Sequence, residues 1–282
     1  MRKVAFYTFG CKVNQYETEK LKKIALENGW EVVPFSEDAD LFFINSCAVT
    51  HVAERKARRL INFIKNHHPN ALIVLAGCYS ERLKLSSETL QIDYILDNKE
   101  KWNFFGSSQS SPYICSEDRA RALLKIQDGC NNFCSYCIVP YLRGREKSRP
   151  INEILTEINI LLNNGIKEII LIGQNVNSYK NSNNEMSKKY NNDFAGLLEK
   201  IVSSFHNIKF WLRFLTNHPK DMKQEIIEIV KKYSNISRHI HLPLQSGSNR
   251  ILQLMNRKYT IEKYIQIVQM IRNILPDIVL TT

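Results

Sequence analysis

The sequence lacks a long hydrophobic segment. Although 44% of the 282 residues are hydrophobic, no apolar run reaches the roughly 20 residues that a membrane-spanning helix needs. The apolar stretch near the amino terminus covers only residues 4–9, and no small-residue cleavage site of a signal peptide follows it. These absences predict a cytoplasmic chain without a membrane segment and leave residues 4–9 as a first β-strand.

The sequence also lacks the conditions for a set of structural disulfides. Seven cysteines are an odd number, so at least one of them has no partner within the chain. Disulfides are rare in the reducing cytoplasm. Metal binding or catalysis is therefore the better explanation of the cysteines.

Acidic residues are fewer than basic ones. The chain has 39 Lys and Arg residues against 28 Asp and Glu residues, which gives a formal net charge of +11 at pH 7. A basic balance of this size favours a polyanionic partner such as RNA or a membrane surface. An ordinary soluble surface rich in lysine is the alternative.

Strand and helix patterns alternate over residues 1–100, which predicts an α/β domain with a parallel sheet and crossover helices. The continuous apolar run at 71–77 is typical of a strand buried on both faces. We expect strands at 4–9, 31–34, 41–45 and 71–77, and helices at 15–28 and 52–67.

Residues 101–118 are rich in Ser, Gly and other polar residues, so we predict a linker there. A second βα series over 119–282 indicates a TIM-like βα barrel. It stops inside an apparent strand, so we expect a partial barrel that is truncated at its carboxyl end. The expected strands are 122–127, 168–173, 209–214, 239–244 and one from 278, the helices are 151–163, 194–204 and 221–233, and a solvated loop covers 175–193.

Cys130, Cys134 and Cys137 stand on one short loop after a predicted strand, with C-x3-C-x2-C spacing. Three thiolates can hold three corners of a cubic 4Fe-4S cluster and leave one iron open for a substrate or cofactor. A structural zinc site needs a fourth ligand nearby, usually from a second C-x2-C pair, and the sequence offers none there. The spacing therefore favours a cluster over a zinc knuckle.

Cys11, Cys47 and Cys78 each follow a predicted strand of the first domain. The carboxyl ends of parallel strands meet at one edge of a sheet, so these cysteines should converge. They again supply three thiolates, which predicts a second cluster with an open iron. Three unreactive core cysteines are the alternative, and Cys115, in the predicted linker, fits neither triplet.

These contexts resemble the methylthiotransferase family of radical S-adenosylmethionine (SAM) enzymes. The second triplet is similar to the radical SAM signature C-x3-C-x-aromatic-C, with Tyr136 at the aromatic position. Matching stretches cover almost the whole chain: GCKVNQYE at 10–17, NSCAVT at 45–50, AGCY at 76–79, DGCNNFCSYCIVPYLRGREKSRP at 128–150, GQNVNSY at 173–179 and HLPLQSGSNRIL at 241–252.

The resemblance implies an auxiliary-cluster domain, a radical SAM barrel and a small RNA-binding β-domain that we expect to be absent here. It implies two 4Fe-4S clusters and SAM as cofactors, with Cys130, Cys134 and Cys137 catalytic and Tyr136 near the adenine of SAM. In the implied reaction, one SAM methylates a sulfur held at the auxiliary cluster. A second SAM gives a 5′-deoxyadenosyl radical, which activates C2–H of an N6-modified adenosine at tRNA position 37.

The motifs of two branches of the family conflict in this chain. The short amino terminus and GCKVNQYE at 10–17 resemble the branch that acts on N6-threonylcarbamoyladenosine, which we prefer. GQNVNSY at 173–179 and RFLTNHPKDM at 213–222 resemble the branch that acts on N6-isopentenyladenosine. A third branch modifies a ribosomal-protein aspartate and usually has Pro after its first Cys, where this chain has Lys12.

The resemblance also implies the tRNA anticodon loop as a partner, an electron donor such as flavodoxin or ferredoxin, and a monomer without a membrane partner. Two alternatives lie outside this class. One is an iron–sulfur carrier that does not cleave SAM, and the other is a zinc-binding RNA-interaction module.

Polar residues that follow barrel strands are candidate cofactor contacts. Gln174 and Asn175 follow the strand at 168–173, and Gln245 and Ser246 follow the strand at 239–244. The carboxyl ends of barrel strands form the catalytic face, although Asn is also common in turns. His239 and His241 share a strand face, where packed or hydrogen-bonded histidines are favoured over ligands.

Basic residues cluster after the cysteine loop and on the second predicted helix. Contact with tRNA phosphates and simple solvation are equally favoured for both groups. The groups are Arg143, Arg145, Lys147 and Arg149, and Arg55, Lys56, Arg58 and Arg59.

Overall fold

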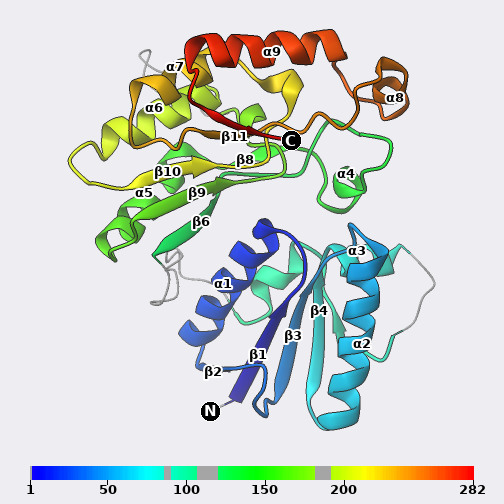
Figure 1. Ribbon diagram of the computed structural model, residues 1–282. Coiled ribbons are helices and arrows are strands. Elements are labelled where there is room, and N and C mark those ends of the chain that lie inside the picture. The colour runs from blue at the N-terminus through cyan, green and yellow to red at the C-terminus, as the bar shows by residue number, and fades with distance from the viewer. Residues whose placement is uncertain (1, 86–89, 107–119, 182–191) are drawn as a thin grey trace. The chain divides into compact units, whose positions relative to one another are not determined.

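The computed structural model describes residues 2–85, 90–106, 120–181 and 192–282. The chain divides into two compact units (Figure 1). Unit 1 comprises Met1–Ile114 and Tyr141–Arg143, and unit 2 comprises Cys115–Pro140 and Gly144–Thr282. No helix in the described parts of the chain has both the length and the apolar character to cross a membrane.

Unit 1 is built on a five-stranded sheet with the order β2-β1-β3-β4-β5, in which every neighbouring pair is parallel. This confirms the predicted α/β class. Helices connect β1 to β2, β3 to β4 and β4 to β5, whereas β2 leads to β3 without a helix. The elements are β1 (Arg2–Thr8), α1 (Lys12–Glu27), β2 (Trp30–Val33), β3 (Leu41–Ser46), α2 (His51–His67), β4 (Leu72–Gly77), α3 (Cys78–Lys84), β5 (Tyr94–Ile95) and the short η1 (Glu100–Asn103).

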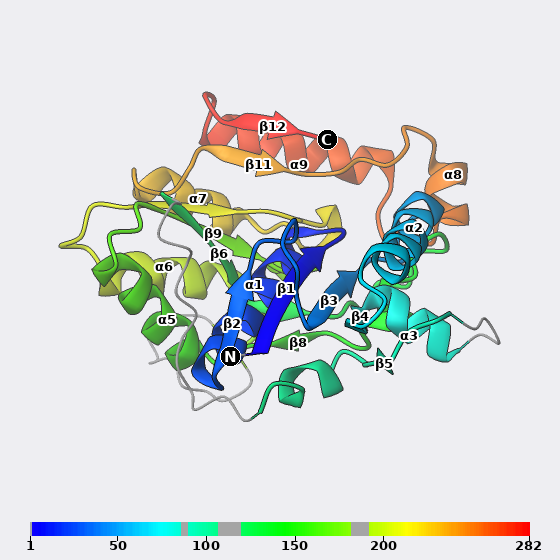
Figure 2. The ribbon, with the colours of Figure 1, turned by 90° about the horizontal axis from the view of Figure 1, so that it is seen from below.

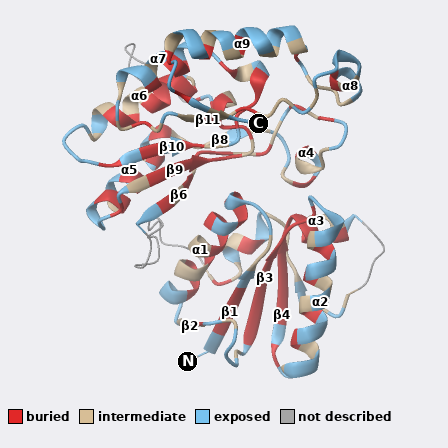
Figure 3. Ribbon diagram, in the orientation of Figure 1, coloured by how far each residue is buried: buried red, intermediate tan, exposed pale blue. Residues whose placement is uncertain are grey.

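Both faces of this sheet are covered. Every residue of β3 is buried, so the strand is red along its length in Figure 3. Leu21 and Ile24 of α1 pack with Phe43 on one face. Successive side chains of a strand point to opposite faces, and Phe42 on the other face contacts His68 at the end of α2. Burial on both sides explains why the central strands are continuous apolar runs.

Unit 2 contains a βα series. Strands β6, β9 and β10 are parallel in the order β10-β9-β6, Leu212 of β10 bridges to Ile236, and β11 then pairs with β12 in parallel. Figure 2 shows β11 and β12 side by side, with α9 along them. The elements are β6 (Arg121–Lys125), β7 (Gln127–Asp128), β8 (Lys147–Ser148), α5 (Ile151–Asn163), β9 (Glu168–Ile172), η2 (Val176–Ser178), α6 (Phe194–Ser204), β10 (Trp211–Phe214), η3 (Pro219–Asp221), α7 (Gln224–Lys232), β11 (His239–His241), α8 (Asn249–Leu254), α9 (Ile261–Ile274) and β12 (Val279–Thr281). The short α4 (Val139–Leu142) begins in unit 2 and ends in unit 1.

Several segments differ from the sequence-based expectation. The predicted strand at 239–244 ends at His241, and the predicted helix at 221–233 covers Gln224–Lys232. The predicted strand at 122–127 ends at Lys125, and Gln127–Asp128 instead forms an antiparallel ladder with Lys147–Ser148. The predicted solvated loop at 175–193 begins with packed residues: Asn177 Nδ2 donates to the His218 carbonyl oxygen, and Tyr179 is fully buried. Residues 182–191 of that loop lie outside the described residues.

The start of the predicted linker at 101–118 is also packed. Lys101 is fully buried in an ion pair with Glu17, and Phe105 belongs to the core beside α1. Apolar and paired charged side chains therefore extend unit 1 beyond residue 100. The remaining linker residues, 107–118, and Cys115 among them, lie outside the described residues.

We expect Gly77→Ala to destabilise unit 1 more than Gly29→Ala does. Both glycines have a left-handed φ, but a Cβ on Gly77 would lie 2.4 Å from the Ser46 carbonyl oxygen, whereas a Cβ on Gly29 meets nothing within 4 Å. The steric clash should add about 1–3 kcal/mol to the loss of unfolding free energy that Gly77→Ala causes. Urea unfolding of a Trp211→Phe background, in which the remaining tryptophans are Trp30 and Trp102 of unit 1, measures both variants. Equal losses for the two would contradict this packing.

Candidate functional site

The structure brings Cys11, Cys47 and Cys78 to one edge of the unit 1 sheet. Cys11 lies between β1 and α1, Cys47 directly follows β3, and Cys78 is the first residue of α3 after β4. The register pairs Ser46 with Gly77, so Cys47 and Cys78 leave their strands at the same level. The expected meeting of strand ends is therefore present.

The three thiols are close enough to affect one another. A Cβ on Gly10 would lie 2.8 Å from the Cys47 Sγ atom, so the glycine lets the first loop approach that cysteine. Burial raises the pKa of Cys47 and of Cys78. Cys11 raises both pKa values further, and Cys47 adds to that of Cys78. The Cys47 and Cys78 thiols therefore favour protonation until a cation or cluster takes up their negative charge.

A buried amide network fixes the loop that carries Cys11. Asn14 Nδ2 donates to the carbonyl oxygens of Phe9 and Ser46, each at 2.9 Å. Asn45 Nδ2 donates to the Asn14 carbonyl oxygen at 3.0 Å. These side-chain to backbone hydrogen bonds join the ends of β1 and β3. They therefore fix the backbone next to Cys11 and next to Cys47.

Neither triplet is arranged for a single metal ion. Among the described residues, no three His, Cys, Asp or Glu side chains form a group suited to one ion. Thiolates on one zinc ion lie about 3.8 Å apart, because each Zn–S bond is about 2.3 Å long. Thiols that are close without this tight grouping suit a larger group such as a cubic cluster.

In unit 2 the second triplet lines a pocket of about 210 Å³. Cys130, Cys134 and Cys137 form one wall, and residues that follow β9, β10 and β11 form the others. Burial raises the pKa of Cys130 and Cys137, and Asn132 opposes this at Cys130, where its Nδ2 donates to the Sγ atom at 3.4 Å. The cysteine loop thus sits at the catalytic face that a βα barrel uses.

The segment after α8 supports the cysteine loop. Asn256 Nδ2 donates to the Phe133 carbonyl oxygen at 2.7 Å, and Ser135 Oγ donates to the Leu254 carbonyl oxygen at 2.8 Å. Arg257 Nη1 donates to the Cys134 Sγ atom at 3.3 Å. A cation beside a thiolate stabilises its charged form, so Arg257 favours ligation by Cys134.

Three buried polar atoms of this pocket's lining residues have no hydrogen-bond partner among the described residues: Asn175 Oδ1, Asn217 Oδ1 and His218 Nε2. His218 Nδ1 accepts a hydrogen bond from the Lys220 amide, which leaves the ring proton on Nε2. Buried polar groups without a partner are costly. Two acceptors and one donor beside the cysteines therefore favour a polar ligand in the pocket.

Most of the predicted cofactor residues lie in this pocket. Tyr136, Gln174, Asn175 and Gln245 are among its lining residues, whereas Ser246 is not. The Ser246 Oγ atom instead accepts a hydrogen bond from the Ser248 amide.

The prediction omitted several lining residues, namely Asn132, Thr216, Asn217, His218 and Arg257. Thr216, Asn217 and His218 follow the strand predicted at 209–214. Residues that follow barrel strands lie at the catalytic face, so the position of these three residues in the sequence was sufficient to predict them as candidates, as it was for Gln174.

His239 and His241 of β11 both contact the Thr281 hydroxyl of β12, at 3.1 and 3.0 Å. The favoured role as hydrogen-bonded barrel residues therefore fits both. His241 also lines the pocket.

The basic run after the cysteine loop is not one exposed surface. The side chains of Arg143 and Arg149 pair with Glu17 and Glu157, and that of Arg143 is only 2% exposed. Phosphate contact by Arg143 is therefore excluded by burial, whereas Arg145 and Lys147 are exposed. On α2, Arg58 lies 3.8 Å from the buried Glu54, and Arg55, Lys56 and Arg59 are exposed.

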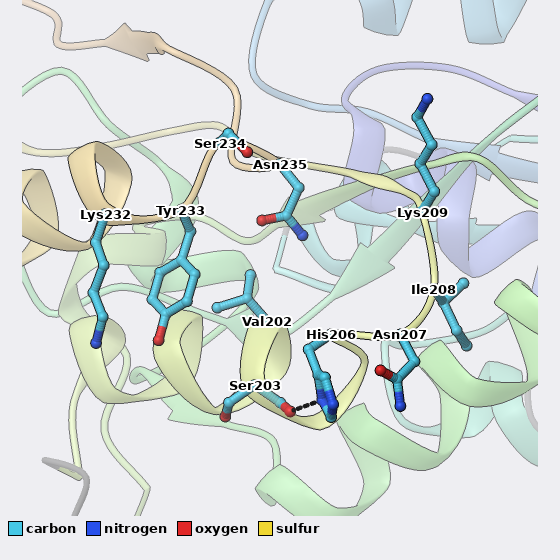
Figure 4. A pocket seen from close by; sticks show the side chains of 10 residues that line it. All are labelled: Val202, Ser203, His206, Asn207, Ile208, Lys209, Lys232, Tyr233, Ser234 and Asn235. Carbon is cyan, nitrogen blue, oxygen red and sulfur yellow. Dashed lines mark hydrogen bonds between the residues drawn. The ribbon is translucent and has the colours of Figure 1, made fainter.

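A larger hollow of about 680 Å³ lies elsewhere in unit 2 (Figure 4). It is lined by the end of α6, the segment before β10 and the turn after α7, including His206, Lys232 and Tyr233. His206 Nδ1 contacts the Ser203 carbonyl oxygen at 3.0 Å. These residues stand at the amino ends of the strands, a face that serves stability in βα barrels, and no cysteine lines the hollow.

Two family profiles match the chain. Residues 124–282 match the radical SAM superfamily, and residues 3–97 match the uncharacterized protein family UPF0004. The fold agrees with solved structures of similar class. The radical SAM methyltransferase TsrM from Kitasatospora setae has a TM-score of 0.61 at 14% identity, covering 97% of this chain and 66% of that one. The cobalamin-dependent radical enzyme OxsB has a TM-score of 0.60 at 12% identity, covering 99% and 48%. The profile match over residues 124–282 identifies the second unit as a radical SAM domain, and the solved structures share its fold.

Sequence relatives give the narrower class. A protein of Thermodesulfovibrio yellowstonii named tRNA-2-methylthio-N(6)-dimethylallyladenosine synthase is 38% identical, covering 100% of this chain and 68% of the relative. A protein of the same name from Azobacteroides pseudotrichonymphae is 36% identical, and the match covers 100% of this chain and 67% of the relative. Another from Treponema denticola is 37% identical, and the match covers 98% of this chain and 68% of the relative. The chain belongs to the methylthiotransferase family of radical SAM proteins.

We expect His218 to stay neutral in the folded apoprotein throughout the physiological range. Burial lowers its pKa from 6.5 to about 3, and the nearby Arg257 adds to the effect. The unfolded chain takes up a proton below about pH 6.5, so this group's contribution to stability is complete above that value and is lost as the pH falls toward 3. NMR of the labelled imidazole should show the Nε2–H tautomer without titration between about pH 5 and 8. A midpoint near 6.5 would contradict the buried position.

Proposed function

We propose that this chain is a tRNA methylthiotransferase that uses two 4Fe-4S clusters and SAM to attach a methylthio group to C2 of N6-dimethylallyladenosine in tRNA. The observation that carries the proposal is the pair of cysteine triplets, each gathered at the carboxyl ends of strands in its own unit. The relatives support the tRNA substrate, since each is named as a synthase of a methylthio nucleoside of tRNA.

The relatives also bear on the N6 group of the adenosine. Their shared name favours the dimethylallyl substituent, which is the isopentenyl branch of the sequence comparison. GQNVNSY at 173–179 and RFLTNHPKDM at 213–222 favour the same branch. The preference for threonylcarbamoyladenosine rested on the short amino terminus and on GCKVNQYE at 10–17, and the names of the relatives outweigh it, so we propose the dimethylallyl substrate in its place.

The unit 2 pocket fits a SAM-binding cluster site. Cys130, Cys134 and Cys137 would hold three irons, and the acceptors Asn175 Oδ1 and Asn217 Oδ1 suit the amino groups of SAM. When bound there, a reduced 4Fe-4S cluster supplies an electron for the cleavage of SAM. The polar atoms beside the thiols favour such an enzyme over a simple iron–sulfur carrier, which needs no ligand pocket.

The unit 1 edge fits a second cluster. Cys11, Cys47 and Cys78 offer three thiols, and a cubic cluster held by three thiolates would have one iron open for a sulfur. Cys47 and Cys78 are buried, whereas Cys11 is exposed at the edge of the site. The residues of this chain would therefore hold and orient the reacting groups. The tRNA anticodon loop at position 37, an electron donor such as flavodoxin or ferredoxin, and a monomeric state stay predictions.

Iron analysis tests the two sites separately. After anaerobic reconstitution, the full chain should hold about eight irons and eight sulfides, from two cubic clusters. The variant with Cys130, Cys134 and Cys137 all changed to Ala should hold about half as much iron. Cys115→Ala is the matched control and should keep the full amount, because Cys115 belongs to neither triplet. Full iron content in the triple variant would refute the site assignment.

Nucleoside mass spectrometry tests the substrate. In cells that lack the gene, the 2-methylthio form of N6-dimethylallyladenosine should disappear from tRNA, and the chain should restore it because its two cysteine triplets would hold the clusters and its unit 2 pocket would take SAM. A chain with Cys130→Ala serves as the inactive control. If the 2-methylthio form of N6-threonylcarbamoyladenosine disappears instead, the proposed N6 group is wrong, while the reaction class stands.

A further inference from the structure

Arg143 follows the cysteine loop in sequence but is buried within unit 1. Its Nη1 and Nη2 atoms donate to the two carboxylate oxygens of Glu17, at 3.0 and 3.1 Å. Nη2 also donates to Asn14 Oδ1. Asn98 Nδ2 donates to the Leu142 carbonyl oxygen at 3.1 Å, which holds the same short segment in unit 1. This bidentate geometry fixes the guanidinium plane.

Glu17 faces a second buried cation. Lys101 is fully buried, and its Nζ atom lies 2.8 Å from Glu17 Oε2. In the part of unit 1 that the structure describes, the other buried carboxylate is that of Glu54, which pairs with Arg82 and Arg58. Lys101 and Arg143 therefore share the one Glu17 carboxylate, and these three side chains together carry one net positive charge. Further negative charge beside them is electrostatically favourable.

The cysteines lie close to this positive charge. The Arg143 guanidinium donates a hydrogen bond to the Cys78 thiol. Its Nη2 atom also donates to Asn14 Oδ1, which accepts from the Cys11 thiol at 3.9 Å. Its positive charge acts on Cys47 as well. The guanidinium therefore lies beside Cys78, is near enough to act on Cys47, and is linked to Cys11 through Asn14.

The charges balance when the site is filled. Three thiolates around an oxidised 4Fe-4S core, which carries two positive charges, leave a net single negative charge. This matches the excess positive charge of the Glu17, Lys101 and Arg143 group. Reduction adds a further negative charge, which a nearby cation stabilises. The arginine is therefore placed to favour both assembly and reduction.

We propose that Arg143 is a positioning residue for the unit 1 cluster, whose guanidinium neutralises the Cys11, Cys47 and Cys78 thiolates and raises the cluster's reduction potential. The proposal rests on the proposed function, since it assumes a cluster at this triplet. It replaces phosphate contact and simple solvation, which the sequence favoured equally for Arg143.

The test uses the whole 282-residue chain with Cys130, Cys134 and Cys137 changed to Ala, so that the remaining cluster is the one in unit 1. An EPR-monitored redox titration should show a negative shift of the midpoint potential in Arg143→Gln, because a positive charge near the added electron is lost. Iron should also leave this variant faster in the presence of a chelator. Arg145→Gln is the matched control: this exposed arginine stands two positions later, so its loss should leave both values unchanged.

Arg143→Lys is the second variant, and it serves if Arg143→Gln does not fold. It keeps the charge beside Glu17 but loses the fork that also reaches Asn14 and Cys78, so a smaller negative shift is expected. An unchanged potential in every variant that folds overturns the role of Arg143 while the cluster stands. Absence of iron from the parent triple variant instead refutes the proposed second cluster.

Discussion

The parallel register of β1, β3 and β4 is the constraint on which the account of unit 1 depends. It brings the ends of the strands to one level, where Gly10 allows close approach to the Cys47 side chain and Gly77 allows close approach to the Ser46 backbone. Three thiols that stand far apart in sequence therefore share one edge. Because burial raises the pKa of Cys47 and Cys78, binding of iron at these thiols is coupled to proton release and is favoured by a nearby positive charge.

Unit 2 also brings three cysteines together, but by a local sequence motif. Its three cysteines come from one loop, and the polar side chains around them come from the ends of three separate strands. Several of these polar atoms have no partner among the described residues, so the pocket is prepared for a ligand before the ligand arrives. Preorganised polar groups of this kind need no rearrangement when the reaction begins.

The charged residues show how burial decides function. The net charge of +11 suggested a surface for RNA, yet Arg143 and Lys101 are directed inward to Glu17. Exposed residues such as Arg145, Lys147, Arg55 and Lys56 remain available for a polyanion. Net charge therefore describes the whole chain and does not identify the residues that bind RNA.

Much of the fold followed from sequence because local patterns determine it. Helices α5 and α6 have the predicted bounds, and the strand-end argument placed both cysteine triplets and Gln174. The role of Arg143 did not follow, because its partner Glu17 is 126 positions away and only tertiary packing joins them.

The packing of residues 101–106 was missed for a similar reason. A polar stretch is typical of a linker, but Lys101 is buried by its ion pair and Phe105 by contacts with β1 and β3. Such pairings lie beyond what periodicity can reveal.

If Cys11, Cys47 and Cys78 bind a single cubic cluster, Mössbauer spectroscopy can detect it on the ⁵⁷Fe-reconstituted chain that lacks the other three cluster cysteines. We expect the spectrum of one 4Fe-4S cluster per chain, and further loss of Cys47 should abolish it. A spectrum of mononuclear iron, or a cluster that persists without Cys47, would contradict it.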